Sequence, residues 1–110
     1  MSDQESKLAQ LKDTAVKQLT ECGVSSIDHD KLDAYVNSLK TMIENQDALL
    51  VAGSDESELE TVRRNFVEKK LGITDKDKAM AAINAVVTKM SDFKMKSRPA
   101  FYYLVAEALN

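Results

Sequence analysis

The sequence is poor in the residues that close loops, cross-link chains or build phosphate sites. Its 110 residues include one cysteine, one proline, three glycines and no tryptophan. A single cysteine excludes an intramolecular disulfide and favours a reducing, cytoplasmic compartment. The glycines stand alone at positions 23, 53 and 72, which excludes the glycine-rich loops that bind phosphates or dinucleotides.

A strong charge imbalance and a membrane-length apolar run are also missing. Fifteen basic and eighteen acidic residues give a net charge of −3, so the chain lacks the positive field of a general nucleic-acid binder. Apolar runs such as Ala48–Ala52 are far too short to cross a membrane, and the N-terminus does not read as a signal peptide. We expect one domain over residues 1–110, with a core that needs no metal or disulfide.

Helix formers dominate what is present, and apolar residues recur every three or four positions. This pattern predicts an all-α fold, a compact bundle of five helices plus a short helical turn. The first expected helix starts at residue 3 or 5 and ends at 22, and the second starts at about 28 and ends at 44 or 45. The other three cover 54–71, 74–90 and 98–110, and the helical turn covers 48–52. The expected N-caps are Ser26 or Asp28, Ser54 or Asp55, Thr74 and Ser97.

The helix after Gly53 has the clearest start and stop signals. Asp55 and Glu58 have the spacing of a capping box at its N-terminus. Gly72 supplies the left-handed residue that ends a helix, and Ile73 can fold back on Val67 as in a Schellman motif.

A helix turns by about 100° per residue, and this places two cations, Arg63 and Lys70, on the apolar side of that helix. Their stems can lie on apolar surface while the charged ends reach water. Alternatively one of them, Arg63 in particular, holds a carboxylate of another helix or an anionic ligand.

Cysteine and histidine give no catalytic or metal-binding pattern. Cys22 continues an apolar stripe and is expected to be a buried, inert thiol. His29 stands among Asp28, Asp30 and Asp33, but this set lacks the ligands of a zinc site and the glycine and glutamate of an EF-hand loop. We therefore predict no metal and no cofactor.

The last expected helix, from Arg98 onward, is apolar almost all round. Such a helix is either central in its domain or covered by a second subunit. Tyr103 and Glu107 mark its wet side, and Tyr102, Tyr103 and Leu109 are the candidate interface residues.

The leading hypothesis is a non-enzymatic interaction or structural domain, with a homodimer formed through the helices over 74–90 and 98–110. No nucleophile elbow, CxxC pair or HExxH motif is present. One alternative is a protein that binds an anionic small molecule through Arg63, Lys70, Arg98 and the tyrosines. Another is a nucleic-acid-associated factor, in which cations would meet phosphates and rings would stack on bases; its basic stretch contains Lys89, Lys94, Lys96 and Arg98.

Two sequence blocks resemble a small bacterial family of conserved all-helical domains of unknown function. They read LVAxSDxxELETVxxNFVxKKLG, from Leu50 to Gly72, and RxxFYYL, from Arg98 to Leu104. The resemblance implies a cytoplasmic, helical, stand-alone protein and brings no activity, cofactor or catalytic residue. It also implies that Lys or Arg serves equally at position 63, which favours a packing or ion-pair role there.

Overall fold

The computed structural model describes residues 3–40 and 49–109. Within them the chain is mostly helical, as predicted, but it also contains a two-stranded antiparallel sheet that was not predicted. The elements in chain order are α1 (Asp3–Glu21), α2 (His29–Ser38), β1 (Leu50–Ala52), α3 (Glu56–Val62), its π-helical continuation η3 (Arg63–Glu68), α4 (Lys76–Lys89), β2 (Met95–Ser97) and α5 (Arg98–Leu109).

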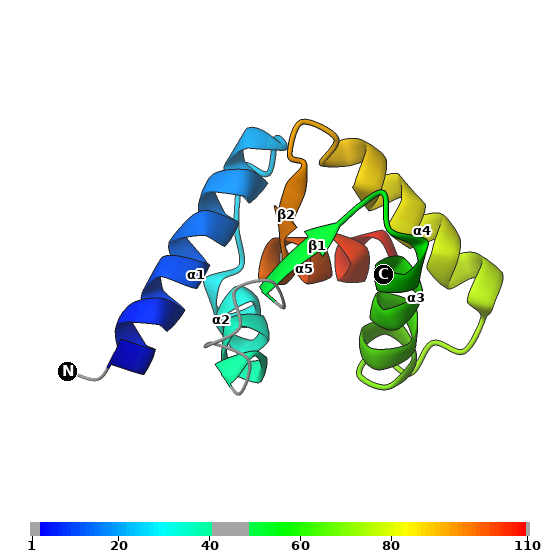
Figure 1. The fold of residues 1–110 in the computed structure, drawn as a ribbon, viewed down its shortest axis with the longest axis horizontal. Coiled ribbons are helices and arrows are strands. Elements are labelled where there is room, and N and C mark those ends of the chain that lie inside the picture. The colour runs from blue at the N-terminus through cyan, green and yellow to red at the C-terminus, as the bar shows by residue number, and fades with distance from the viewer. Residues whose placement is uncertain (1–2, 41–48, 110) are drawn as a thin grey trace.

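Helix α5 is the central element. It lies between α1 and α4 and behind the β1–β2 ribbon in Figure 1, and it packs against α1, α2, α4 and both strands. Every residue from Arg98 to Ala106 is buried. The all-round apolar sequence of this segment therefore reflects contacts with neighbours on all sides.

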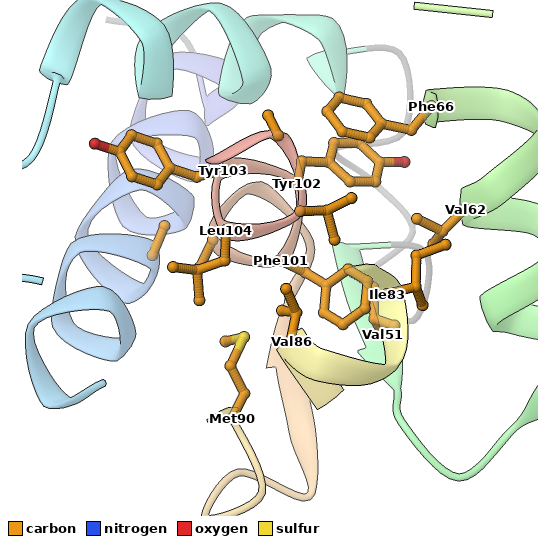
Figure 2. Close-up of a cluster of buried hydrophobic side chains, with 14 of the residues drawn as sticks. Val51, Val62, Phe66, Ile83, Val86, Met90, Phe101, Tyr102, Tyr103 and Leu104 are labelled. Atoms are coloured by element: carbon orange, nitrogen blue, oxygen red, sulfur yellow. The ribbon is translucent and has the colours of Figure 1, made fainter. Parts of the chain in front are cut away.

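The core gathers around the aromatic residues of α5. In the close-up of Figure 2, the ring of Phe101 lies beside Val51, Ile83 and Val86, which come from β1 and α4. Phe101 is fully buried. Burial of a side chain of this size stabilises the fold by about 1.5–3 kcal/mol, so Phe101 contributes to the packing of α5 on α4 and β1.

The predicted helical turn over 48–52 is wrong, because Leu50–Ala52 forms β1. This strand pairs with β2, which lies in the segment 91–97 that we expected to be a loop. Val51 is opposite Lys96 in the register. Three-residue strands are too short to show a period of two, and their pairing joins segments more than 40 residues apart, so local pattern does not reveal them.

Helix ends differ from expectation at several places. Helix α2 ends at Ser38, well before the predicted residue 44 or 45, and residues 41–48 lie outside the described part of the chain. Asp28 and Asp55 cap their helices as predicted. Helix α4 is capped by Asp75 and not by Thr74, because the Asp75 carboxylate accepts from the Lys78 amide.

Ser97 does not cap α5 as predicted. Its hydroxyl is buried and has no hydrogen-bond partner among the described residues. Its amide donates instead to the side-chain oxygen of Gln18, at 2.7 Å. A hydrogen bond between α1 and the residue before α5 therefore comes from Gln18, which the sequence patterns did not single out.

The left-handed conformation of Gly72, in the segment after η3, can be tested by substitution. Gly72 has φ of +71°, and a Cβ built there would meet nothing within 4 Å. Gly72→Ala should therefore lose about 1–2 kcal/mol of unfolding free energy through backbone strain alone. Gly72→Asn should lose less, because asparagine tolerates this conformation. Urea unfolding of the three proteins measures the difference, and equal stability of the alanine variant and the parent would contradict the assignment.

Candidate functional site: the buried and half-buried cations

Arg98 is buried where α5, α3 and β1 meet. Its guanidinium forms an ion pair with the Glu58 carboxylate of α3 and donates to the Tyr102 hydroxyl at 3.2 Å. A longer contact of 3.5 Å reaches the carbonyl oxygen of Leu50 in β1. The Arg98 side chain is only 8% exposed, so its charge needs such partners. Burial lowers the pKa of Arg98, but Tyr102 and Glu58 outweigh it and raise the net value.

Three aromatic rings pack together next to Arg98, beginning with Tyr102, which it contacts. Tyr102 stacks on Phe66 with ring centroids 4.1 Å apart, which Figure 2 shows as two nearly parallel rings. Tyr35 of α2 meets both rings edge-on, at 5.4 Å from Phe66 and 6.3 Å from Tyr102. These arrangements are favourable for aromatic pairs. Together with Arg98 they join α2, η3 and α5.

Arg63 finds its partners on its own helical segment and not on another helix. It donates to Glu60 through Nε, at 3.1 and 3.2 Å, and to Glu68 through Nη1, at 3.3 Å. Residues 63 and 68 are five apart, a spacing that the wider π-helical turn brings to one side. The hydrogen bonds from Arg63 lower the pKa of Glu60. Lys70, predicted to share the apolar arc, is exposed. The helical segment ends at Glu68 and not at the predicted residue 71, so Lys70 lies beyond it, and the π-helical turns change the angular spacing before it.

The structure therefore does not bring Arg63, Lys70 and Arg98 together as one anion-binding site. Arg63 and Arg98 each hold carboxylates of their own, on different residues, and Lys70 lies on the surface. Arg63 and Arg98 are neutralised largely within the chain. Their geometry supports the packing and ion-pair role that the family resemblance implied for position 63.

Lys96 is a buried cation that sequence reasoning placed on a basic surface. It is 4% exposed because it stands opposite Val51 in the ribbon, and paired residues share one face of a sheet. Its ammonium donates to the Phe93 carbonyl at 2.6 Å and has no carboxylate partner among the described residues. A Cβ at Gly53 would lie 2.9 Å from Nζ, so the lysine uses the space that this glycine leaves. Desolvation lowers the pKa of Lys96.

This burial removes much of the proposed nucleic-acid surface. Of its four cations, Lys96 and Arg98 are buried and only Lys89 and Lys94 are exposed. The aromatic residues that follow this stretch, Phe101, Tyr102 and Tyr103, are buried as well, so their rings cannot stack on bases in solvent. Two exposed lysines do not form the continuous basic track that phosphate binding uses.

Tyr102 and Tyr103 do not lie on the surface as a candidate interface requires. They are 6% and 2% exposed, and only Leu109 of the three is half-exposed. Tyr103 was expected on the wet side of its helix. The N-terminus of α2 covers it, because the Asp28 amide donates to the Tyr103 hydroxyl at 3.0 Å.

The thiol and imidazole lie at the surface or near it. Cys22 is half-buried, and its Sγ contacts the Lys89 carbonyl at 3.7 Å. Burial raises the pKa of this thiol, and Lys89 lowers it less, so it is chiefly protonated near neutral pH. His29 is exposed at the start of α2. Across the residues that the structure describes, no three His, Cys, Asp or Glu side chains group as metal ligands do.

These features define a small, mostly helical domain whose buried ionic groups join its elements together. A family model described as "Protein of unknown function (DUF2853)" matches residues 11–110, and the chain belongs to this family. The resemblance drawn from the two sequence blocks is thereby confirmed as membership of a family of unknown function. The comparison with curated proteins gave no match. No described helix has the length and apolar character needed to cross a membrane.

The Arg98 junction gives the second test. Arg98→Met should lose about 3 kcal/mol of unfolding free energy, because it leaves Glu58 and Tyr102 without their buried partner. Arg98→Lys should lose an intermediate amount, since lysine keeps the charge but lacks the planar fork. Arg63→Met is the matched control and should lose less than either, because its partners lie near water. Chemical denaturation ranks the four proteins; an Arg98→Met protein as stable as Arg63→Met would contradict this role.

Lys96 gives the third test. A lysine whose folded-state pKa is depressed destabilises the fold wherever it stays charged, and this penalty disappears as pH rises through the folded value toward 10.5. Relative to Lys96→Met, the parent protein should therefore gain unfolding free energy between neutral pH and about pH 10. Lys94→Met, at an exposed position, should show no such difference. Parallel pH profiles for the parent and Lys96→Met would overturn the assignment.

Proposed function

We propose that this protein is a cytoplasmic, non-enzymatic interaction domain that self-associates through α4 and α5. The observation that carries the proposal is a groove of about 340 Å³ between these helices. Its apolar lining comes from both helices and from the segment after α1, and opposite charges stand at its rim. The lining residues are Val24, Ala85, Val86, Lys89, Leu104, Glu107 and Ala108.

The rim charges make this groove self-complementary. Lys89 of α4 and Glu107 of α5 are both exposed, and neither has an ion-pair partner in the described part of the chain. A two-fold dimer places the same patch on both copies, so that residue i meets j and j meets i. Lys89 of one copy can therefore face Glu107 of the other, twice in one interface. The small side chains of Ala85 and Ala108 allow the helices of the two copies to approach closely.

The chemistry of the remaining groups supports a non-enzymatic role. Cys22 has a raised pKa, which disfavours the reactive thiolate. Arg63 and Arg98 are held by carboxylates of the same chain. The lone cysteine also supports the cytoplasmic assignment, because disulfides are rare there.

A charge-swap series tests self-association. Lys89→Glu and Glu107→Lys should each weaken the dimer, because each sets like charges against one another twice, and the double variant should restore it. Sedimentation equilibrium over a concentration series measures the dimer dissociation constant. Lys78→Glu, at an exposed position of α4 outside the groove, should leave the constant unchanged.

Two results would refute this arrangement. The first is a parent protein that stays monomeric throughout the concentration series. The second is a double variant no better than the single ones, given unfolding curves that show all variants folded. The folding control matters because Lys89 lies in the last turn of α4, where a cation also stabilises the helix.

A further inference from the structure

A second concave site lies on a different side of α5. It has a volume of about 270 Å³ and is enclosed by α2, the segment after η3 and the last turns of α5. The lining residues are Lys31, Tyr35, Leu71, Ile73, Ala106 and Leu109. At 100° per residue, Ala106 and Leu109 lie roughly 100–160° around the helix from Leu104 and Ala108 of the α4–α5 groove, so the two sites use different faces of α5.

The walls of this pocket are aliphatic, while its two polar groups come from α2. Lys31 and Tyr35 are four residues apart, so their side chains lie on the same face of the helix. Leu71, Ile73, Ala106 and Leu109 provide the apolar surface. A pocket with apolar walls and a few convergent polar groups is the usual form of a small-molecule site.

Both polar groups can donate to a ligand. The Lys31 ammonium lies 5.6 Å from the centre of the Tyr103 ring and has no carboxylate partner among the described residues. The Tyr35 hydroxyl makes no hydrogen bond within the same part of the chain. Burial raises the pKa of Tyr35, and Glu107, Tyr103 and Asp28 add to the effect, so the phenol remains a donor at neutral pH.

We propose that this pocket binds a small carboxylate with an apolar chain, its carboxylate held by Lys31 and Tyr35 and its chain lying against Leu71, Ile73, Ala106 and Leu109. An ammonium and a phenol hydroxyl together supply charge-assisted donors for one carboxylate. The volume equals that of about nine water molecules, which admits a chain of some six carbons and is too small for a drug-sized ligand. The negative charges of Glu107 and Asp28 are the competing influence, so the charge of the preferred ligand is the decisive measurement.

The experiment titrates the full chain with hexanoate, hexanol and hexylammonium, followed by amide chemical shifts in NMR spectra. Hexanoate should shift the amides of Leu71, Ile73 and Ala106 and bind more tightly than the other two. Its affinity should exceed that of pentanoate about fourfold, as expected for one more buried methylene. Tighter binding of hexylammonium, equal binding of hexanol, or shifts confined to other parts of the chain would overturn the proposal.

Variants separate the site from a general apolar effect. Lys31→Met should weaken hexanoate binding about tenfold, the loss expected for one hydrogen bond to a charged group, and should leave hexanol binding unchanged. Tyr35→Phe should weaken hexanoate less and keep the ring packing with Phe66. Lys78→Met is the matched control on α4. Unchanged hexanoate affinity in Lys31→Met would refute the proposed contact, and this result is independent of the dimer measured above.

Discussion

The arrangement of the chain depends on the neutralisation of one buried guanidinium. Arg98 begins α5 at the centre of the fold, where an unpaired charge would be very costly. Glu58 from α3 supplies the countercharge, Tyr102 from the next turn of α5 accepts a hydrogen bond, and the Leu50 carbonyl of β1 lies at the edge of contact. Three elements must therefore hold one relative position for the charge to be accommodated. Apolar packing alone is non-directional and would allow them to slide.

The position of β1 then decides the environment of its partner strand. Leu50 stands opposite Ser97, the residue before Arg98, and this register sets Val51 opposite Lys96. The face of the ribbon that buries Val51 must then also bury the lysine. Gly53 leaves space for the Lys96 side chain, and the Phe93 carbonyl accepts its hydrogen bond. A buried lysine with no carboxylate partner in the described ranges is thus a consequence of the pairing that positions α5.

The sequence predicts helices well here, and it predicts the surroundings of individual charges poorly. Apolar periodicity and caps such as Asp55 and Gly72 located the helical segments, because these signals are local. The β1–β2 pairing depends on contacts between distant segments, and it reverses the expected exposure of Lys96. The π-helical turns after Val62 likewise change the angular spacing on which the placement of Lys70 relied. A helical wheel assumes one pitch throughout, so it fails at such a turn.

Charged residues that have an ion-pair partner within the chain differ from those that have none among the described residues, and this difference decides which surfaces can bind a partner or ligand. Arg63 and Arg98 attract attention in the sequence, yet their carboxylate partners leave little of their charge for a ligand. Lys89 and Glu107 border one apolar concavity and Lys31 borders another, and no ion pair within the described residues satisfies them. Because α5 separates the two concavities, a second copy can occupy one while a small carboxylate occupies the other. Binding at either site would stabilise the folded chain. Glu107 borders the groove and its charge also acts on Tyr35 of the pocket, so it provides an electrostatic link between the two sites.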